Sequence, residues 1–151
     1  MDRNAILGGY VSDFKSYSTS DSRATVEKVL KYSGTSSDIL RRGDIKKEIV
    51  VFRLLSGSTG YVLDDEKPDE LSQGFEALVY VEQSDGHSTK DIAYDRILEI
   101  TDQLIDWATQ VVANDVNTKL YTISLTGVGA TNEQNGYLSA SVNFQSIIKI
   151  S

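Results

Sequence analysis

Three glycines spaced like those of a nucleotide-binding loop, Gly127, Gly129 and Gly136, lie among small polar residues in the stretch TGVGATNEQNG. A phosphate-binding loop of the GxxxxGK[ST] type needs a lysine that contacts the phosphates and a following helix that supplies backbone amides. This stretch has no lysine, and the alternating residues after Gly136 are typical of a strand. We therefore expect a flexible hairpin tip, in which Asn135 and Gly136 form the turn or a bulge, and no phosphate site.

His87 is the single histidine of the chain and lies in the polar stretch SDGHSTK. A general base needs a positioned partner and a substrate cleft, and a metal ligand needs companion ligands. The neighbouring serines and aspartate are adjacent in sequence only, so we expect an exposed histidine in a loop. The chain has no cysteine, which excludes disulfides, zinc–thiolate sites and cysteine nucleophiles.

Five acidic residues crowd the stretch DDEKPDELSQG at residues 64–74, together with the only proline, Pro68. A calcium loop of the EF-hand kind needs alternating acidic positions and a flexible glycine turn, and Pro68 falls where that turn is required. We expect a solvated loop here, with an adventitious cation site at residues 64–70 as the alternative. The sequence therefore predicts no catalytic residue, no metal ligand and no cofactor site, and a role other than that of an enzyme.

Composition and charge narrow the class of protein. A chain of 151 residues fits one domain, residues 1–151, which we divide into an N-terminal segment (1–45) and a core (46–151). Residues 1–53 carry a net charge of +3 and residues 54–151 a net charge of −10. An acidic body disfavours specific nucleic-acid binding, since phosphates need a basic face. No apolar run reaches the ~18–20 residues of a membrane helix, and the N-terminus lacks the pattern of a secretory signal, so we expect synthesis in the cytoplasm.

Hydrophobic periodicity indicates the secondary structure. Residues 4–17 have helical spacing, which Gly8 and Gly9 oppose, and residues 19–32 make a better helix capped by Ser20 or Asp21. A strand at 46–55, apolar on successive positions, suits a sheet covered on both faces or a subunit contact. SGSTG then turns the chain into a short partner strand at 61–63, and residues 75–83 alternate as a strand.

The clearest element is an amphipathic helix at about 91–112, capped by Ser88 or Asp91, with an apolar stripe that Leu98 and Ile105 widen. Trp107 lies on that stripe, and we expect it in the core, with a subunit interface as the alternative. Residues 120–126 and 137–150 alternate and should pair as a C-terminal β-hairpin. The order of elements predicts an α+β fold, in which the long helix covers a mainly antiparallel sheet and the N-terminal segment is helical.

The second half of this pattern resembles a known class of virion proteins. A strand (FEALVYVEQ), a polar loop, a long helix (YDRILEITDQLIDWATQ) and a polar-looped hairpin (KLYTISLTGVGATNEQNGYLSASVNFQSI) follow one another. This order is similar to that of small neck and tail-completion proteins of tailed bacteriophages, and the tail terminator is the nearest analogue. The resemblance covers residues 46–150 and involves no catalytic motif.

The resemblance implies a homo-oligomeric ring in the virion, typically a hexamer, at the head-proximal end of the tail tube. Such a ring stops tube polymerisation and joins the tail to the head connector, while DNA passes through its lumen without specific binding. Its subunits often extend sheets across their contacts, which points to the strand at 46–55 and the final hairpin. The candidate interface residues are Ile49, Val51, Phe52, Arg53, Trp107, Gly127, Gly129, Asn135 and Gly136. The near alternative is a connector ring of another stoichiometry. The alternative of a different class is a small α+β ligand-binding module or enzyme, with its ligand under the glycine-rich stretch.

Overall fold

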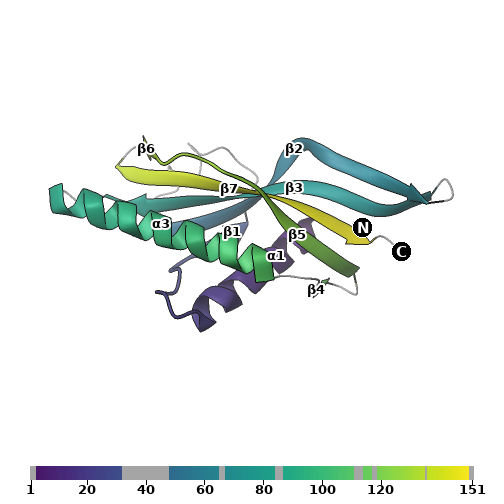
Figure 1. Ribbon diagram of the computed structural model, residues 1–151, viewed down its shortest axis with the longest axis horizontal. Coiled ribbons are helices and arrows are strands. Elements are labelled where there is room, and N and C mark those ends of the chain that lie inside the picture. Colours follow the sequence, from purple (N-terminus) through teal and green to yellow (C-terminus); the bar gives the residue numbers. More distant parts are fainter. Residues whose placement is uncertain are drawn as a thin grey trace.

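One mixed β-sheet carries two described helices on the same face in a computed structural model of the chain (Figure 1). The structure describes residues 3–31, 48–64, 67–83, 87–110, 114–116, 119–134 and 136–149. Strand order in the sheet is β1-β2-β3-β7-β5-β4, and β6 pairs with β7 beside β5. The elements are α1 (Arg3–Ser20), β1 (Val29–Lys31), β2 (Glu48–Asp64), β3 (Lys67–Glu82), α3 (His87–Gln110), β4 (Asn114–Val116), β5 (Lys119–Val128), β6 (Asn132–Gln134) and β7 (Tyr137–Lys149).

The predicted fold class is confirmed. All described strand pairs are antiparallel except β1 with β2, and α3 packs against β3, β7 and β5. Helix α3 forms because Ile97, Ile100 and Leu104 recur at steps of three and four residues and are fully buried on the sheet. It begins at His87, so Ser88 and Asp91 lie inside the helix and neither is its cap. Neither described helix is long and apolar enough to cross a membrane.

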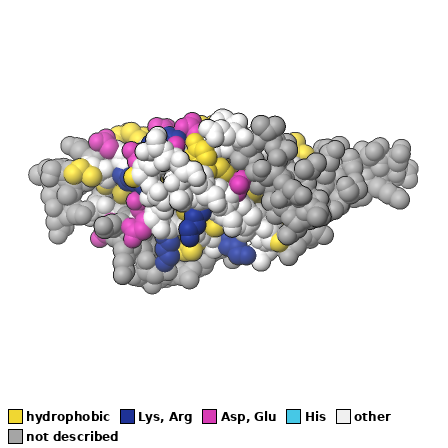
Figure 2. Space-filling model, turned by 90° about the horizontal axis from the view of Figure 1, so that it is seen from below, with side chains coloured by type: hydrophobic (Ala, Val, Ile, Leu, Met, Phe, Trp, Pro, Cys, Tyr) yellow, Lys and Arg dark blue, Asp and Glu magenta, His cyan; other side chains and the backbone are white. Residues whose placement is uncertain are grey.

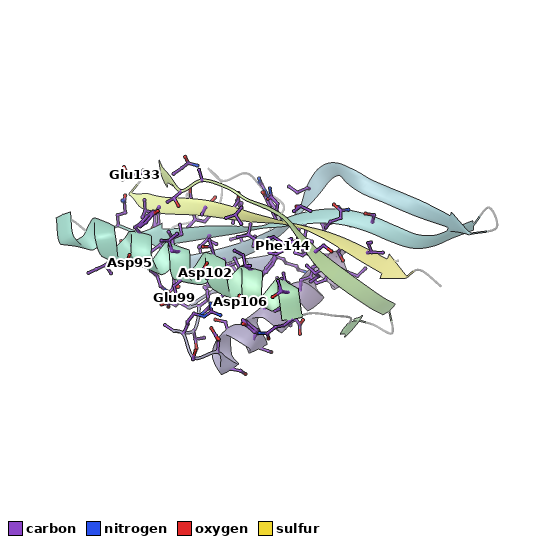
Figure 3. The ribbon with its side chains drawn as sticks, viewed as in Figure 1. Asp95, Glu99, Asp102, Asp106, Glu133 and Phe144 are labelled. Carbon is purple, nitrogen blue, oxygen red and sulfur yellow. The ribbon has the colours of Figure 1, made fainter. Side chains whose placement is uncertain are left out.

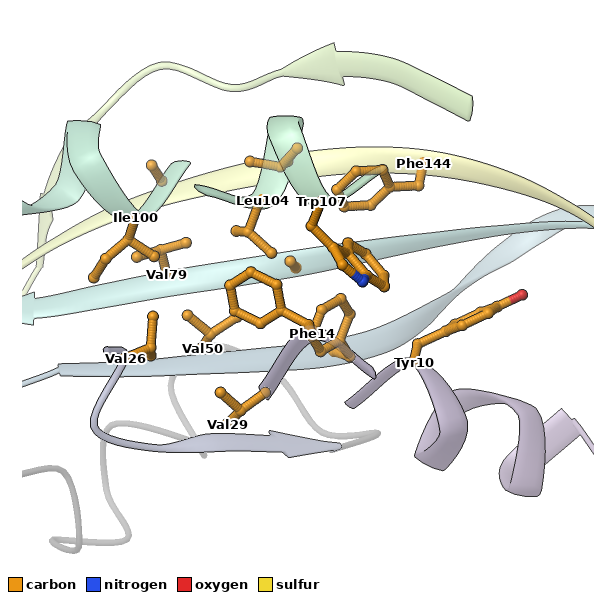
Figure 4. Packing of buried hydrophobic residues seen from close by; sticks show 14 of the residues in the cluster. Tyr10, Phe14, Val26, Val29, Val50, Val79, Ile100, Leu104, Trp107 and Phe144 are labelled. Atoms are coloured by element: carbon orange, nitrogen blue, oxygen red, sulfur yellow. The ribbon is translucent and has the colours of Figure 1, made fainter. Parts of the chain in front are cut away.

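Aromatic side chains form the centre of the core between the two helices and the sheet (Figure 4). Trp107 on α3 is 1% exposed, and its ring lies edge-on to those of Tyr10, Phe14, Phe52 and Phe144, with centroid distances of 5.6 to 6.5 Å. These five rings come from α1, α3, β2 and β7. The N-terminal segment therefore shares one core with residues 46–151.

The predicted helix at residues 19–32 is wrong. The helix is α1, which ends at Ser20, and the chain then continues to β1, where Val29 pairs with Val50. Each of the two glycines in α1 costs about 1 kcal/mol relative to alanine, yet the helix buries Tyr10 and Phe14 almost completely. Tertiary packing thus outweighs local helix propensity, and the Val26 amide donates to the Ser18 hydroxyl just beyond the helix.

The predicted turn at residues 56–60 and the predicted acidic loop at 64–74 are also wrong. Strand β2 continues to Asp64 with register shifts between Leu54 and Thr59 and between Val62 and Leu63, and β3 begins at Lys67. The turn residues of SGSTG therefore occupy an irregular part of a long strand, where β-bulges absorb them. Figure 1 shows the resulting β2–β3 hairpin extending far beyond the helices at one end of the sheet.

The C-terminal hairpin is confirmed, but its loop is shorter than predicted. After β5, which pairs with residues 142–148, β6 pairs with residues 137–139 of the same strand, β7. Residues 129–131 leave the ladder, and Gly136 directly precedes β7. Gly136 has a φ of 81°, in the left-handed region that tight two-residue hairpin turns require. Asn135 itself lies outside the described residues.

Candidate interaction surfaces

Four of the residues proposed for subunit contacts are buried inside the chain. Phe52 and Trp107 belong to the aromatic core, and Ile49 and Val51 lie on the opposite face of the sheet, each 1% exposed or less. That second face also buries Leu78 and Tyr80, with Leu30 and Tyr137 packed against them. A strand covered on both faces was one of the two interpretations of this apolar run, and the structure confirms it. We therefore no longer count Phe52 and Trp107 as interface candidates, and neither Ile49 nor Val51 offers exposed surface.

Arg53 is engaged within its own sheet. Its guanidinium forms an ion pair with the Glu76 carboxylate on the neighbouring strand, directly opposite in register. Glu76 is buried, and Asn143 of β7 is its register partner on the other side. This polar row continues the face that Ile49 and Val51 begin, so Arg53 serves there to compensate a buried carboxylate.

Gly127 and Gly129 have local roles in the hairpin. Gly127 follows a register shift at Leu125, which marks a β-bulge, and a side chain there would meet nothing within 4 Å. Gly129 donates its amide to the Ser141 carbonyl at 2.8 Å, and a Cβ at Gly129 would lie 2.5 Å from the Ser141 hydroxyl. The glycine at 129 thus permits a close approach of the chain to β7. Gly127 thus lies in strand β5, and the predicted loop narrows to residues 129–131.

A shallow groove lies beneath this irregular segment, on the face of the sheet opposite the helices. It has a volume of about 360 Å³. Glu133 is the one carboxylate of its described lining, and it accepts a hydrogen bond from the Gln83 amide at 3.2 Å. Nearby, burial and then the Glu82 carboxylate raise the pKa of the Tyr137 phenol. The groove offers hydrogen bonds but no acid–base pair in that lining. Its lining residues are Leu78, Tyr80, Ala130, Asn132, Glu133, Ser139, Ala140 and Ser141.

Exposed apolar side chains gather where α3 meets β5. Leu125 and Val128 share the helix-side face of β5, because they pair with Phe144 and Val142 of the core, yet they are 39% and 51% exposed. Tyr94 and Leu98, four residues apart on α3, are 47% and 42% exposed. Since α3 packs against β5, we name these four residues the α3–β5 strip. Leu98 was predicted to widen the buried stripe, and its exposure shows that prediction to be wrong.

On each side of the sheet, part of the edge has no pairing strand among the described residues. Strand β4 pairs with residues 119–121 of β5, and within the described chain no strand pairs with the outer edge of residues 122–128. At the other side β1 pairs with residues 50–52 of β2, and no described strand pairs with the outer edge of residues 59–64. Open edges present unpaired backbone amides and carbonyls to any approaching strand.

A ridge of acidic side chains follows the solvent side of α3 (Figure 3). Asp95, Glu99, Asp102 and Asp106 lie at steps of three and four residues, so they share one side of the helix. Glu99 pairs with Arg96, and Asp106 pairs with Arg23 at 2.9 Å. Seen from below, acidic, basic and apolar side chains are intermingled on the described surface, without a continuous basic stripe (Figure 2).

Arg96 on α3 bonds to the segment between α1 and β1 and to the start of β2. Its guanidinium bonds to the Glu48 carboxylate at 2.8 Å and to the carbonyls of Ala24 and Thr25 at 3.2 and 3.3 Å. Gln103 adds a hydrogen bond to the Ala24 carbonyl and accepts one from Ser18. These contacts hold the segment between α1 and β1 against α3, and they are structural in kind.

The side chains considered for chemistry, at His87 and at residues 64–70, lie outside the described part of the chain. His87 is the first residue of α3, so its backbone is helical where a loop was predicted. Its side chain lies outside the described residues. Residues 64 and 67–70 lie in β2 and β3, while 65 and 66 are outside the described part. No cluster of three or more metal-ligating residues occurs among the residues that the structure describes.

Comparisons with known proteins inform the fold. No protein-family model matches the sequence, and no curated protein matches it. A solved structure, of a protein whose name states no function, is similar over 100% of this chain and 98% of its own length, with a TM-score of 0.55 and 8% identity. At this identity the likeness concerns the fold alone. What the open edges and the apolar strip are for therefore has to be argued from their own physical chemistry.

Proposed function

We propose that this protein is a virion structural subunit that forms a ring at the head-proximal end of a phage tail, ends the tail tube and joins it to the head connector. One observation carries the proposal: among the strands that the structure describes, two unlike stretches of sheet edge, on β5 and on β2, have no pairing partner. Contacts between unlike surfaces are heterologous, and repeated heterologous contacts close into a ring when the rotation allows.

Charge supports the same proposal. The chain has a net charge of −7, and the acidic ridge on α3 presents carboxylates at each turn. Carboxylates repel DNA phosphates and release no counterions on contact, so such a surface suits DNA that passes without being retained. The order of strand, helix and hairpin resembles that of tail-completion proteins, and this resemblance supports a position of the subunit at the end of the phage tail.

The test begins with native mass spectrometry at micromolar concentration and negative-stain images of the purified protein. We expect a discrete closed oligomer with a central hole, with a hexamer as the expected stoichiometry. Purified tail tubes and head connectors are then added separately. A terminator binds tube ends and stops their elongation, whereas a connector ring of the alternative kind binds heads and leaves tube growth unchanged.

The groove on the face of the sheet opposite the two described helices favours a second candidate function, a small-molecule-binding module. It lies beneath residues 129–131 and combines the apolar Leu78 with two serine hydroxyls, of Ser139 and Ser141. Such a mixture of apolar surface and a few polar groups is typical of ligand sites. A strict monomer that neither assembles nor binds tubes, and whose melting temperature rises with a small molecule, would favour this function and refute the ring.

A further inference from the structure

The α3–β5 strip continues the surface of the core beyond the flank of α3. On β5, Leu125 and Val128 face the helix side but stay 39% and 51% exposed, although α3 packs against this strand. On α3, Ile105 is partly buried against the core, while Tyr94 and Leu98 on the same flank are 47% and 42% exposed. The strip therefore offers apolar side chains from two elements on the helix side of the sheet.

Two carboxylates border this strip. Asp95 and Asp102 are exposed, and Figure 3 shows both on α3. They lie three residues before and four residues after Leu98, so helical geometry places them next to it. Neither forms an ion pair with another described residue, whereas the other two acids of the ridge pair with arginines. Because residues 120–132 contain no charged residue, the negative charge borders the strip on its α3 side.

A basic amphipathic helix fits these features in size and spacing. A helix with its side chains is about 10 Å across and packs about 8–10 Å from a neighbouring helix, so a helix beside α3 would contact α3 and β5 together. Asp95 and Asp102 are seven residues apart, which corresponds to about 10.5 Å along α3. Lysine or arginine residues seven apart on the second helix repeat at the same interval, and apolar residues between them would meet Leu98 and Leu125.

Charge selects the class of partner. The three arginines whose side chains the structure describes, Arg23, Arg53 and Arg96, already pair with carboxylates of their own chain. A second copy would bring a further net charge of −7 to a border that is negative. The anionic surface of a membrane would be repelled by the same carboxylates. A different protein with a basic helix complements the strip in both charge and hydrophobicity.

We propose that the α3–β5 strip is the docking site for a basic amphipathic helix of another protein. The four apolar residues of the strip contact the apolar side of that helix, and Asp95 and Asp102 pair with its lysine or arginine residues. Apolar contact supplies most of the affinity, and the exposed ion pairs fix the position of the helix along α3. Each subunit carries the whole strip, so this contact does not depend on the ring.

Fluorescence anisotropy with a labelled synthetic peptide tests the inference. The peptide is an amphipathic helix of about 21 residues, with lysine at every seventh position and leucine on the adjoining face. A control peptide carries glutamate in place of each lysine. We expect the natural protein to bind the lysine peptide at micromolar concentrations and to bind the glutamate peptide at least about tenfold more weakly.

Matched variants locate the binding surface. Leu125→Arg should abolish binding of the lysine peptide, whereas Ile147→Arg, at a residue of similar exposure (42% against 39%) on the opposite face of the sheet, should leave it unchanged. Asp95→Asn with Asp102→Asn should weaken binding about tenfold, whereas Glu27→Gln, at an exposed acid outside the strip, should change it by less than about twofold. Circular dichroism verifies that each variant folds, and the aspartate variant tests the site even if Leu125→Arg does not fold.

Three results would overturn the inference. The first is equal affinity of the natural protein and both strip variants for the lysine peptide, which would place the contact elsewhere. The second is binding to vesicles of phosphatidylcholine and phosphatidylserine that Leu125→Arg removes, and the third is a homo-oligomer that Leu125→Arg dissociates, because a membrane or a second copy would then occupy the strip. A monomer that ignores tail tubes but binds the lysine peptide at the strip would refute the ring and support this inference.

Discussion

Replacing Trp107 by alanine tests the placement of the aromatic core. The ring is 1% exposed and touches aromatic rings from α1, β2 and β7, so its removal leaves a cavity that a rigid sheet cannot fill. Tryptophan-to-alanine changes in cores cost about 3–5 kcal/mol. The Nε1 group has no hydrogen-bond partner among the described residues, and leaving a buried donor unsatisfied costs about 1–3 kcal/mol, which the substitution recovers. We therefore expect a loss near the lower end, about 3 kcal/mol.

Urea denaturation followed by far-ultraviolet circular dichroism measures this loss, at one protein concentration for all variants because assembly stabilises the folded state. With a slope of about 2 kcal/mol per M, the midpoint should fall by about 1.5 M. Trp107→Phe removes the unsatisfied donor but keeps an aromatic ring, so its loss should be smaller, about 1–2 kcal/mol. Ile92→Ala, at a residue 66% exposed on the same helix, should change stability by less than about 0.5 kcal/mol. A Trp107→Ala midpoint equal to that of Ile92→Ala would refute the placement of Trp107 in the core.

Three further predictions concern local contacts. Arg96→Met should lower the free energy of unfolding by about 1–3 kcal/mol, because the Glu48 carboxylate, only 14% exposed, loses its partner. The double variant Arg96→Met with Glu48→Gln should recover part of that loss in urea denaturation. Gly136→Ala should cost about 1–2 kcal/mol at its positive φ, whereas Gly127→Ala, with open space for a Cβ, should cost less, and equal midpoints would contradict the predicted turn. The Arg23 guanidinium beside Asp21 lowers the pKa of that carboxyl. The ionised carboxylate therefore stabilises the fold above about pH 4, and this stabilisation is lost as the pH falls through the lowered pKa. The Asp21→Asn variant should lose less free energy of unfolding than the natural protein between pH 7 and pH 2.

The strongly periodic elements could be predicted from the sequence. Helix α3 and strand β3 follow from apolar residues at the right spacing. The alternating residues Phe75, Ala77, Val79 and Val81 share the face of β3 that lies in the core. Gly136 could be predicted as a turn residue because Asn-Gly between alternating runs is a strong local signal. In these cases the local signal and the tertiary packing favour the same conformation.

The failures occur where local and tertiary preferences conflict. Gly8 and Gly9 disfavour a helix, but α1 buries Ile6, Leu7, Tyr10 and Phe14, and that burial determines the outcome. Likewise SGSTG favours a turn, while pairing of Thr59 with Gln73 keeps it in a strand. No local pattern reports such distant contacts, because the partners are separated in sequence. Phe52 and Trp107 were assigned to the candidate interface for the same reason. A sequence pattern does not distinguish a bulky apolar residue of the core from one at a subunit contact.

The α3–β5 strip shows which signal could have separated those two cases. Leu125 alternates with Ile123 as core residues do, the register shift after Leu125 brings Val128 to the same face, and periodicity alone assigned Leu98 to the buried stripe. What marks the strip is the absence of charge along an edge strand, from residue 120 to residue 132, whereas β2 and β3 carry the ion pair of Arg53 with Glu76. No strand of the described chain covers the outer edge of residues 122–128, and this edge also exposes leucine and valine, which favours a partner there. A charge introduced at Leu125 should consequently weaken binding of that partner without weakening the fold, whereas a cavity at Trp107 should weaken the fold even in a subunit that has no neighbour.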